Sequence, residues 1–253
     1  MDIEKTKVPA LTRAVTLLEL LARQGPMSRA KLLEKSGIPR SSCYNIIDEL
    51  IKQGLLRQDS DGKVMLWMKT IYLGTAATVA LDLKDIVLPH ILNLLGIYDC
   101  IHVQYGALYG DKAYYLLKRS NQNASFQAMA LEGMEMSMVQ AGLGKLLLAF
   151  QDEAFRERIL PELDYTPVTP NSIRSPELLR KELAKIRLQG WSIGNEEGEM
   201  GFRSISAPIF DGNHNLKGGI SIVGTVYKFT DDLLPSIVDS TIQCAKAISR
   251  ELA

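Results

Sequence analysis

The sequence is poor in the residues from which metal centres and disulfide frameworks are built. Its 253 residues include three cysteines and three histidines. The cysteines lie far apart within apolar segments, at Cys43, Cys100 and Cys244. The histidines are isolated and show no metal-ligand spacing, at His90, His102 and His214. This usage is typical of a reducing compartment, excludes a disulfide-stapled domain and predicts no metal site.

Long apolar runs are also missing, and no leader segment is expected. No uninterrupted apolar segment approaches the roughly 20 residues that a transmembrane helix needs. The N-terminal segment, MDIEKTKVPA, is polar and unlike a secretory signal peptide. We therefore expect a cytoplasmic protein without a membrane partner.

Charge of one sign is not in excess, but it is unevenly distributed. The chain has 29 Lys and Arg against 29 Asp and Glu, a net charge of zero. Up to Thr70 there are 12 basic and 8 acidic residues, a balance of +4, and the remainder carries the opposite balance of −4. A modestly basic N-terminal part on an acidic body weakly favours a nucleic-acid-binding head.

Residues 36–52, SGIPRSSCYNIIDELIK, have the pattern of an amphipathic helix. Apolar side chains recur at helical spacing, at Cys43, Ile46, Ile47, Leu50 and Ile51. The opposite face offers Ser41 and Asn45 as base contacts, and Arg40, Ser42 and Tyr44 beside it as phosphate contacts. Such groups donate to phosphates and base edges, so we interpret the segment as a DNA recognition helix. An ordinary amphipathic surface helix fits this segment alone equally well.

A first helix is predicted over residues 9–23 and is ended by Gly25-Pro26. Its expected inward stripe consists of Leu11, Ala14, Val15, Leu18, Leu21 and Ala22. Leu17 and Leu20 fall off that stripe and form a second apolar patch. Either a dimer contact or packing against a later helix of the same chain accounts for this patch.

The neighbouring segments complete a winged helix-turn-helix pattern within residues 1–75. Ser28 is placed to cap a short helix over residues 29–35, and a glycine-containing turn at 36–39 leads into the recognition helix.

A hairpin follows the recognition helix. Two strand-like runs, at residues 55–58 and 63–67, flank Asp61-Gly62, which is a strong hairpin-turn signal. We interpret this hairpin as the wing, from which Arg57 and Lys63 are expected to reach phosphate or the minor groove.

The rest of the chain predicts a second, separate domain. Residues 76–84 are expected to form a connecting helix, and residues 85–253 alternate between helical and strand patterns, which gives an α/β domain and an overall α+β fold class. We expect helices at residues 85–95, 144–150, 152–159, 176–188 and 231–252. We expect strands at residues 99–105, 113–118, 125–130, 191–193, 203–210 and 216–224.

Residues 142–144 have the features of an anion site. They precede a predicted helix, whose first backbone N–H groups have no intrahelical partner and attract negative charge. Ser204 and Ser221 lie on two predicted strands joined by a short turn, and hydroxyls with amides can hold a carboxylate. The alternative is that Gly142 and Gly144 only permit close packing and that the serines bond to the backbone.

Six segments share the spacings of one known family. In the N-terminal part they are RAVTLLELLA at 13–22, IPRSSCYNIIDELIKQGLL at 38–56 and WMKTIYLG at 67–74. In the C-terminal part they are AGLGKLLLAF at 141–150, GWSIGNEEGEMGFRSISAPIFD at 190–211 and LKGGISIVGT at 216–225. Together they resemble the IclR-type transcriptional regulators, the isocitrate lyase regulator family.

The resemblance implies a winged helix-turn-helix domain joined by a helix to a GAF-like effector-binding domain. It implies a homodimer or a dimer of dimers that binds double-stranded DNA and needs no cofactor. The function it implies is a ligand-responsive transcriptional regulator, expected to be a repressor, that senses a small carboxylate-bearing effector. Transferred position by position, the effector contacts are Gly142, Leu143, Gly194, Asn195, Ser204, Ser221 and Val223.

Three departures from the family pattern affect this transfer. Asn45 stands where relatives more often carry arginine, so the target sequence cannot be transferred. Gly194-Asn195 replaces a common acidic pair, and Val223 replaces a serine. A pocket with fewer polar groups is compatible with a sugar acid or an aromatic acid, or with loss of effector binding.

An enzyme is not expected. Residues 219–223, Gly-Ile-Ser-Ile-Val, resemble a nucleophile elbow, but valine replaces its final glycine. Gly144-Lys145 resembles part of a phosphate-binding loop, but Leu146 replaces its serine or threonine. Two other classes stay open: a sensor protein whose head mediates only protein association, and a hydrolase that uses Ser221.

Overall fold

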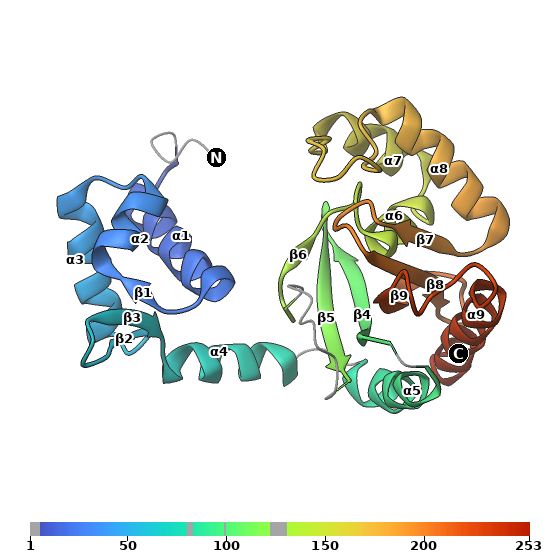
Figure 1. Ribbon diagram of the computed structural model, residues 1–253, viewed down its shortest axis with the longest axis horizontal. Coiled ribbons are helices and arrows are strands. Elements are labelled where there is room, and N and C mark those ends of the chain that lie inside the picture. The colour runs from blue at the N-terminus through green and yellow to red at the C-terminus, as the bar shows by residue number, and fades with distance from the viewer. Residues whose placement is uncertain (1–5, 80–82, 99, 122–130) are drawn as a thin grey trace. The chain divides into compact units, whose positions relative to one another are not determined.

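A computed structural model of the protein describes residues 6–79, 83–98, 100–121 and 131–253 (Figure 1). The chain divides into two compact units, Met1–Leu81 and Asp82–Ala253, which we call the head and the body. Each unit has its own apolar core, around Ile47 in the head and around Leu146 in the body.

The head contains the predicted winged helix-turn-helix. Its helices are α1 (Pro9–Gln24), α2 (Arg29–Ser36), α3 (Arg40–Lys52) and α4 (Met68–Val79). Its strands are β1 (Met27–Ser28), β2 (Leu56–Gln58) and β3 (Lys63–Leu66), which form an antiparallel sheet in the order β1-β3-β2. Strand β1 was not predicted, because two residues are too few to show an alternating pattern.

Local polar contacts set the ends of these elements. The Ser28 hydroxyl accepts a hydrogen bond from the Lys31 amide at 3.3 Å and caps α2, as predicted. In the wing, the Asp59 carboxylate accepts a hydrogen bond from the Lys63 amide at 2.8 Å. Gly62 in the same turn has φ +77°, a conformation that other residues adopt only with strain.

The buried face of α1 differs from the predicted one. Leu17 and Leu21 are 0% and 3% exposed in the head core, whereas Leu11 is 63% and Val15 is 43% exposed. Of the two alternatives for this patch, packing against a later helix of the same chain is therefore the one that holds, and Leu17 is not available as a dimer contact. Leu20 is half-buried and packs against the same core. The helix carries two apolar stripes, and its contact with α3 buries the one through Leu17.

The body is built on one antiparallel sheet in the order β6-β5-β4-β9-β8-β7. The strands are β4 (His102–Tyr109), β5 (Lys112–Ser120), β6 (Glu135–Met136), β7 (Ser192–Asn195), β8 (Phe202–Phe210) and β9 (Leu216–Thr225). The helices are α5 (Lys84–Ile97), α6 (Gly142–Ala149), α7 (Glu153–Ile159), α8 (Pro176–Gln189) and α9 (Leu234–Glu251).

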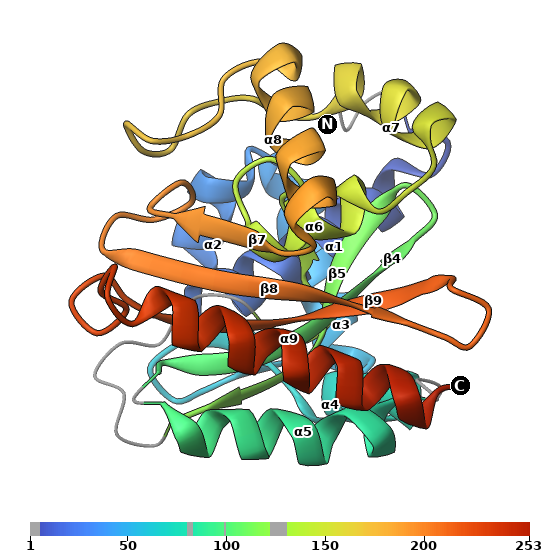
Figure 2. The ribbon, with the colours of Figure 1, turned by 90° about the vertical axis from the view of Figure 1, so that its right-hand side faces the viewer.

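Helices cover both faces of this sheet. Helices α5 and α9 lie side by side along one face, where they contact β4 and β8 (Figure 2). Helix α6 contacts β7, β8 and β9 from the other face, and α8 packs on α6. Apolar side chains such as Leu146 of α6 and Leu183 of α8 fill the space between these helices and the sheet. The α+β fold class predicted from the sequence is confirmed.

The segment between the head and the body lies partly outside the described residues. The predicted connecting helix at 76–84 overlaps the end of α4 and the start of α5, and residues 80–82 lie outside the described residues. The strand predicted at 125–130 also lies outside them. Strand β6, which pairs with β5, was not predicted.

Candidate functional site

Helix α3 presents the predicted polar face away from the head core. Cys43, Ile47 and Leu50 are buried, whereas Ser41 and Asn45 on the opposite side are exposed. No side chain caps the start of α3 at Pro39, and the first amide N–H groups of a helix have no intrahelical partner. The N-terminus of α3 therefore offers backbone amides and side-chain hydroxyls of the kind that bind phosphates and base edges.

Two guanidinium groups lie near the ring of Tyr44 on the same helix. The Cζ atoms of Arg40 and Arg29 are 5.8 Å and 5.9 Å from the ring centroid. Arg29 also donates hydrogen bonds to Asp48 Oδ1 at 2.6 Å and to Gln58 Oε1 at 2.9 Å. One side chain thus joins α2, α3 and the wing. No local sequence pattern indicates this role of Arg29, because its partners are 19 and 29 residues away.

The other predicted DNA contacts differ in the exposure and in the intramolecular contacts of their polar groups. Ser42 is half-buried, and its hydroxyl accepts a hydrogen bond from Arg13 Nη1 at 3.3 Å. In the wing, the guanidinium of Arg57 stacks over the Trp67 ring with Cζ 4.5 Å from the centroid, and Lys63 is exposed. The exposed members of the predicted set are Arg40, Ser41, Asn45, Arg57 and Lys63.

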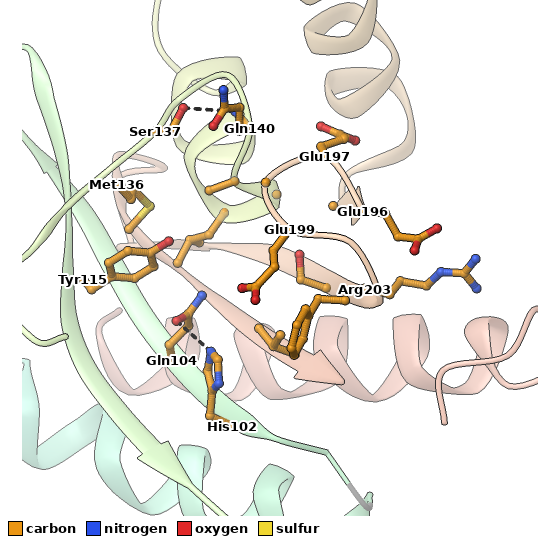
Figure 3. Close-up of a pocket in the computed structure, with 18 of the residues that line it drawn as sticks. His102, Gln104, Tyr115, Met136, Ser137, Gln140, Glu196, Glu197, Glu199 and Arg203 are labelled. Atoms are coloured by element: carbon orange, nitrogen blue, oxygen red, sulfur yellow. Dashed lines mark hydrogen bonds between the residues drawn. The ribbon is translucent and has the colours of Figure 1, made fainter. Parts of the chain in front are cut away.

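The body contains a cavity of about 350 Å³ between the sheet, the first turn of α6 and the loop that connects β7 and β8 (Figure 3). Five of the predicted effector contacts line it: Gly142, Leu143, Gly194, Ser204 and Val223. The other two predicted contacts, Asn195 and Ser221, are not among its lining residues.

The strand register explains why Ser221 is away from the cavity. Strands β8 and β9 are neighbours, as predicted, but Ser204 pairs with Val223, and Ser221 pairs with Ser206. The fully buried Ser206 hydroxyl donates to the equally buried Ser221 hydroxyl at 3.0 Å. A nucleophilic serine needs an accessible hydroxyl, so this burial does not support the hydrolase alternative. Asn195 is engaged as well, because its Oδ1 accepts from the Arg203 guanidinium at 2.9 Å.

Two glycines let backbone and a hydroxyl meet closely at the cavity. A Cβ atom added to Gly194 would lie 2.6 Å from Ser204 Oγ, and one added to Gly142 would lie 2.7 Å from the same oxygen. These distances are shorter than any real Cβ contact. The Ser204 hydroxyl, the Gly194 backbone and the start of α6 therefore form one compact polar surface. Gly144 has a different role, since its Cβ would collide with the Ser137 carbonyl at 2.1 Å.

Strand β4 contributes a buried polar pair to the cavity that the sequence did not reveal. His102 and Gln104 are 2% and 5% exposed, and His102 Nε2 lies 3.1 Å from Gln104 Oε1. Burial, assisted by the positive charge of Lys118, lowers the pKa of His102 to about 3. The imidazole is therefore neutral at physiological pH.

A buried ion pair holds the loop beside the cavity. Lys145 of α6 is fully buried, and its Nζ donates to both carboxylate oxygens of Glu197, 2.6 Å from Oε1. The Ser172 and Thr169 hydroxyls donate to the Glu197 carbonyl oxygen at 2.7 Å and 3.1 Å. In Figure 3 the Glu197 and Arg203 side chains point away from the cavity interior. The loop is thus fixed from its outer side.

Both the head and the body match models of a known family. Residues 75–250 match the family model described as "Bacterial transcriptional regulator IclR C-terminal", and residues 10–60 match the "IclR helix-turn-helix domain". The protein belongs to the IclR family. This IclR-family member is thus a DNA-binding transcriptional regulator, and the main functional prediction from the sequence is confirmed.

Curated relatives cover almost the whole regulator. It is 36% identical over 250 residues to the uncharacterized HTH-type transcriptional regulator RhmR of Escherichia coli K12, which covers 99% of this chain and 95% of the relative. It is 26% identical over 246 residues to the transcriptional repressor IclR of the same organism, with coverage of 96% and 89%.

Solved structures share the fold of both units. The IclR protein of Thermotoga maritima matches with a TM-score of 0.74 at 28% identity, covering 96% of this chain and 98% of that one. An IclR homologue of Microbacterium hydrocarbonoxydans, solved in complex with 4-hydroxybenzoate, matches with a TM-score of 0.76 at 23% identity and the same coverage. The second likeness shows the fold alone.

The described part of the chain contains neither a metal-binding cluster nor a membrane-spanning helix. Among the described residues, no group of three or more His, Cys, Asp or Glu side chains is arranged to hold a metal ion. No helix in the described part of the chain is both long and apolar enough to cross a membrane.

Proposed function

We propose that this regulator is a repressor that binds double-stranded DNA as a homo-oligomer and releases or engages it when a small organic acid enters the body cavity. The proposed domain organisation is a DNA-binding head at residues 1–75, a connecting helix at 76–84 and an effector-binding domain at 85–253. The observation that carries the proposal is the exposed polar face of α3, whose apolar face is buried in the head core.

In the head, Ser41 and Asn45 are the proposed base contacts. Both lie on the exposed face of α3 near its uncapped start. Arg40, Tyr44 and Ser42 are the proposed phosphate contacts, with Ser42 held in place by Arg13. Arg57 and Lys63 of the wing add positive charge at the edge of this surface, so their contribution is mainly electrostatic.

In the body, the proposed carboxylate site is the first turn of α6 with the Ser204 hydroxyl. The amides of the first helical turn lack intrahelical acceptors, and Ala141 at the N-cap supplies no side-chain bond. The positive end of a helix and a neighbouring hydroxyl together favour a carboxylate. A relative whose solved structure contains 4-hydroxybenzoate, a small organic acid, supports this choice of ligand class.

Because Leu17 is buried, we place the proposed oligomer contact on a different, exposed face of α1. Leu11 and Val15 are exposed on that face, and Val8 precedes them one turn earlier. An exposed apolar stripe on a small DNA-binding head suits a second copy, because a two-fold dimer reads two half-sites. Size-exclusion chromatography with light scattering tests this, and we expect Leu11→Asp to lower the measured mass.

Two assays test the proposed function. Fluorescence anisotropy with genomic DNA fragments over a salt series should give binding whose log K falls linearly with log salt. Thermal shift with a panel of small organic acids should raise the melting temperature of the body, because a ligand stabilises the state it binds. A protein that binds neither duplex DNA at low ionic strength nor any acid does not have this function.

A further inference from the structure

The polar pair of β4, His102 and Gln104, lines the cavity on the far side of β9 from Ser204. The two residues occupy alternate positions of the strand and therefore face the same side of the sheet. The register places His102 opposite Val223 of β9, and Val223 in turn pairs with Ser204 of β8. In Figure 3 both side chains of the pair extend from β4 toward the cavity. The pair and the Ser204 hydroxyl therefore belong to one surface of the sheet.

The side chain of Gln104 has one end bonded and the other open to the cavity. Its Oε1 lies 3.1 Å from His102 Nε2, and the imidazole nitrogen is the donor because a carbonyl oxygen only accepts. Gln104 Nε2 has no hydrogen-bond partner among the described residues and, unlike His102 Nδ1, is not enclosed by protein. Gln104 as a whole is only 5% exposed. A donor in this position favours an acceptor from a ligand, because an unmade buried hydrogen bond costs about 1–3 kcal/mol.

His102 holds the Gln104 amide in one orientation. The neutral imidazole has a single N–H group, and the Gln104 carbonyl oxygen accepts from it. Because the oxygen and the nitrogen of an amide point in different directions, this bond turns the NH₂ group of Gln104 toward the cavity. His102 Nδ1 is enclosed and makes no contact with a ligand. His102 therefore acts on a ligand only through Gln104.

We propose that Gln104 Nε2 donates a hydrogen bond to a neutral oxygen acceptor of the effector, and that His102 is the residue that positions this donor. The inference rests on the proposed function, which puts the effector carboxylate at the first turn of α6 and Ser204. Strand β9 lies between β8 and β4, so the backbones of Ser204 and Gln104 are about 10 Å apart at a strand spacing of about 4.8 Å. The effector class is therefore an acid with a carbonyl, ether or hydroxyl oxygen on a carbon remote from its carboxylate.

The charges around the cavity favour a neutral acceptor over a second anionic group. Four glutamates line the cavity: Glu135, Glu196, Glu197 and Glu199. Arg203 also lines it, but its guanidinium is paired with Asp231 at 2.8 Å. A ketone or hydroxyl oxygen is not repelled by these carboxylates, whereas the second carboxylate of a dicarboxylic acid is.

Isothermal titration calorimetry with matched acids tests the Gln104 contact on the full chain. Each pair shares one skeleton without and with a remote ketone, whose oxygen only accepts: pentanoate with 4-oxopentanoate, hexanoate with 5-oxohexanoate, and 4-ethylbenzoate with 4-acetylbenzoate. For at least one pair we expect the oxo acid to bind about tenfold more tightly, the effect of one well-placed hydrogen bond. In Gln104→Met, which keeps the side-chain length but not the donor, this ratio should fall to about one. The matched control Gln243→Met, on the exposed surface of α9, should keep the ratio.

Two substitutions of His102 test its positioning role. His102→Gln keeps an N–H donor at a similar distance along the side chain, so the preference for the oxo acid should survive. His102→Leu removes the donor and lets the Gln104 amide turn, so the preference should fall while the affinity for the acid without the ketone stays near the parental value. A purely structural role of His102 would instead weaken both acids of a pair equally.

The possible outcomes separate this inference from the proposed function. Equal affinity within every pair in the parental protein overturns the Gln104 contact and leaves the organic-acid effector standing. A preference that persists in Gln104→Met also overturns the contact, and an equal loss for both acids in His102→Leu overturns the positioning role. Absence of binding by every acid contradicts the proposed organic-acid effector itself.

A second readout uses the parental protein and does not depend on how the variants fold. In protein labelled with ¹⁵N at the glutamine side-chain amides, the Gln104 signals are assigned by their through-space contact with the His102 ring. The preferred oxo acid should shift the Gln104 amide protons downfield, and the matched acid without the ketone should not. A bound oxo acid that leaves these signals unchanged overturns the contact.

Discussion

Lys145 Nζ lies 2.6 Å from Glu197 Oε1, and this contact joins helix α6 to the loop between β7 and β8. The lysine side chain is fully buried and that of Glu197 is largely so. Burial raises the pKa of Glu197, and the adjacent ammonium group opposes that effect. A buried pair of this kind depends on both partners, because either one alone is an uncompensated charge in an apolar environment.

Removal of one partner should therefore destabilise the body strongly. We expect Lys145→Met to lower the free energy of unfolding by about 3–5 kcal/mol. The double variant Lys145→Met/Glu197→Gln should be less destabilised than the sum of its single variants, since the orphaned charge is gone. Urea unfolding followed by circular dichroism measures this, with the exposed Lys181→Met as control. Strictly additive effects would show that the pair is not coupled.

Gly194→Ala should impair effector binding by changing the shape of the carboxylate site. The new Cβ would stand 2.6 Å from Ser204 Oγ, so the hydroxyl or the start of α6 must move. We expect the thermal shift caused by a bound acid to disappear, while the unliganded protein keeps its fold. Gly96→Ala is the matched control, because its Cβ meets no atom within 4 Å. If Gly194→Ala keeps the ligand-induced thermal shift, then the backbone at Gly194 does not form part of the carboxylate site.

The buried His102 should make the body sensitive to acid. Its pKa is about 3 in the folded protein and 6.5 ordinarily, so below pH 6.5 the unfolded chain takes up a proton that the folded chain does not. The stability that neutral His102 contributes should be fully present above pH 6.5. The free energy of unfolding should fall as the pH drops toward 3, by about 1.4 kcal/mol per pH unit at most. Melting temperatures between pH 7 and pH 4.5 measure this loss, and His102→Gln should lessen it. Parallel profiles for the two proteins would contradict the assignment.

Two substitutions on α3 should separate phosphate contacts from base contacts. Arg40→Ala should weaken binding to all DNA sequences and reduce the salt slope by about 1. Asn45→Ala should instead relax the preference at one base pair and leave non-specific affinity nearly unchanged. Anisotropy titrations on specific and scrambled duplexes distinguish the two, with Lys185→Ala on α8 as a charge control. An Arg40→Ala protein with the parental slope would exclude Arg40 from phosphate binding.

The sequence predicted the elements of the head well because local signals determine them. Ser28 caps α2 and Asp61-Gly62 lies in the turn of the wing, and both signals lie within a few residues of their effects. The inward face of α1 was predicted only in part: Leu21 is buried as expected, whereas Leu11 is exposed and Leu17 is buried in its place. Only the contact with α3 decides which stripe is buried.

The site in the body depended on contacts that no local pattern carries. The adjacency of β8 and β9 followed from their short turn, but the register that pairs Ser204 with Val223 did not. The hydrogen bonds of Lys145 with Glu197 span 52 residues. His102 was an isolated histidine in the sequence, and its burial beside Gln104 depends on the position of β4 within the sheet.

The most direct test of the account is the affinity for duplex DNA measured with and without a bound acid. Fragments selected from bacterial genomic DNA by the purified protein serve as probes, in anisotropy titrations from low to physiological salt. We expect tight, salt-dependent binding and a change in affinity of about 5–150-fold when the acid that stabilises the body is added. Failure to bind any duplex at low ionic strength, or an affinity that the bound acid leaves unchanged, would contradict it.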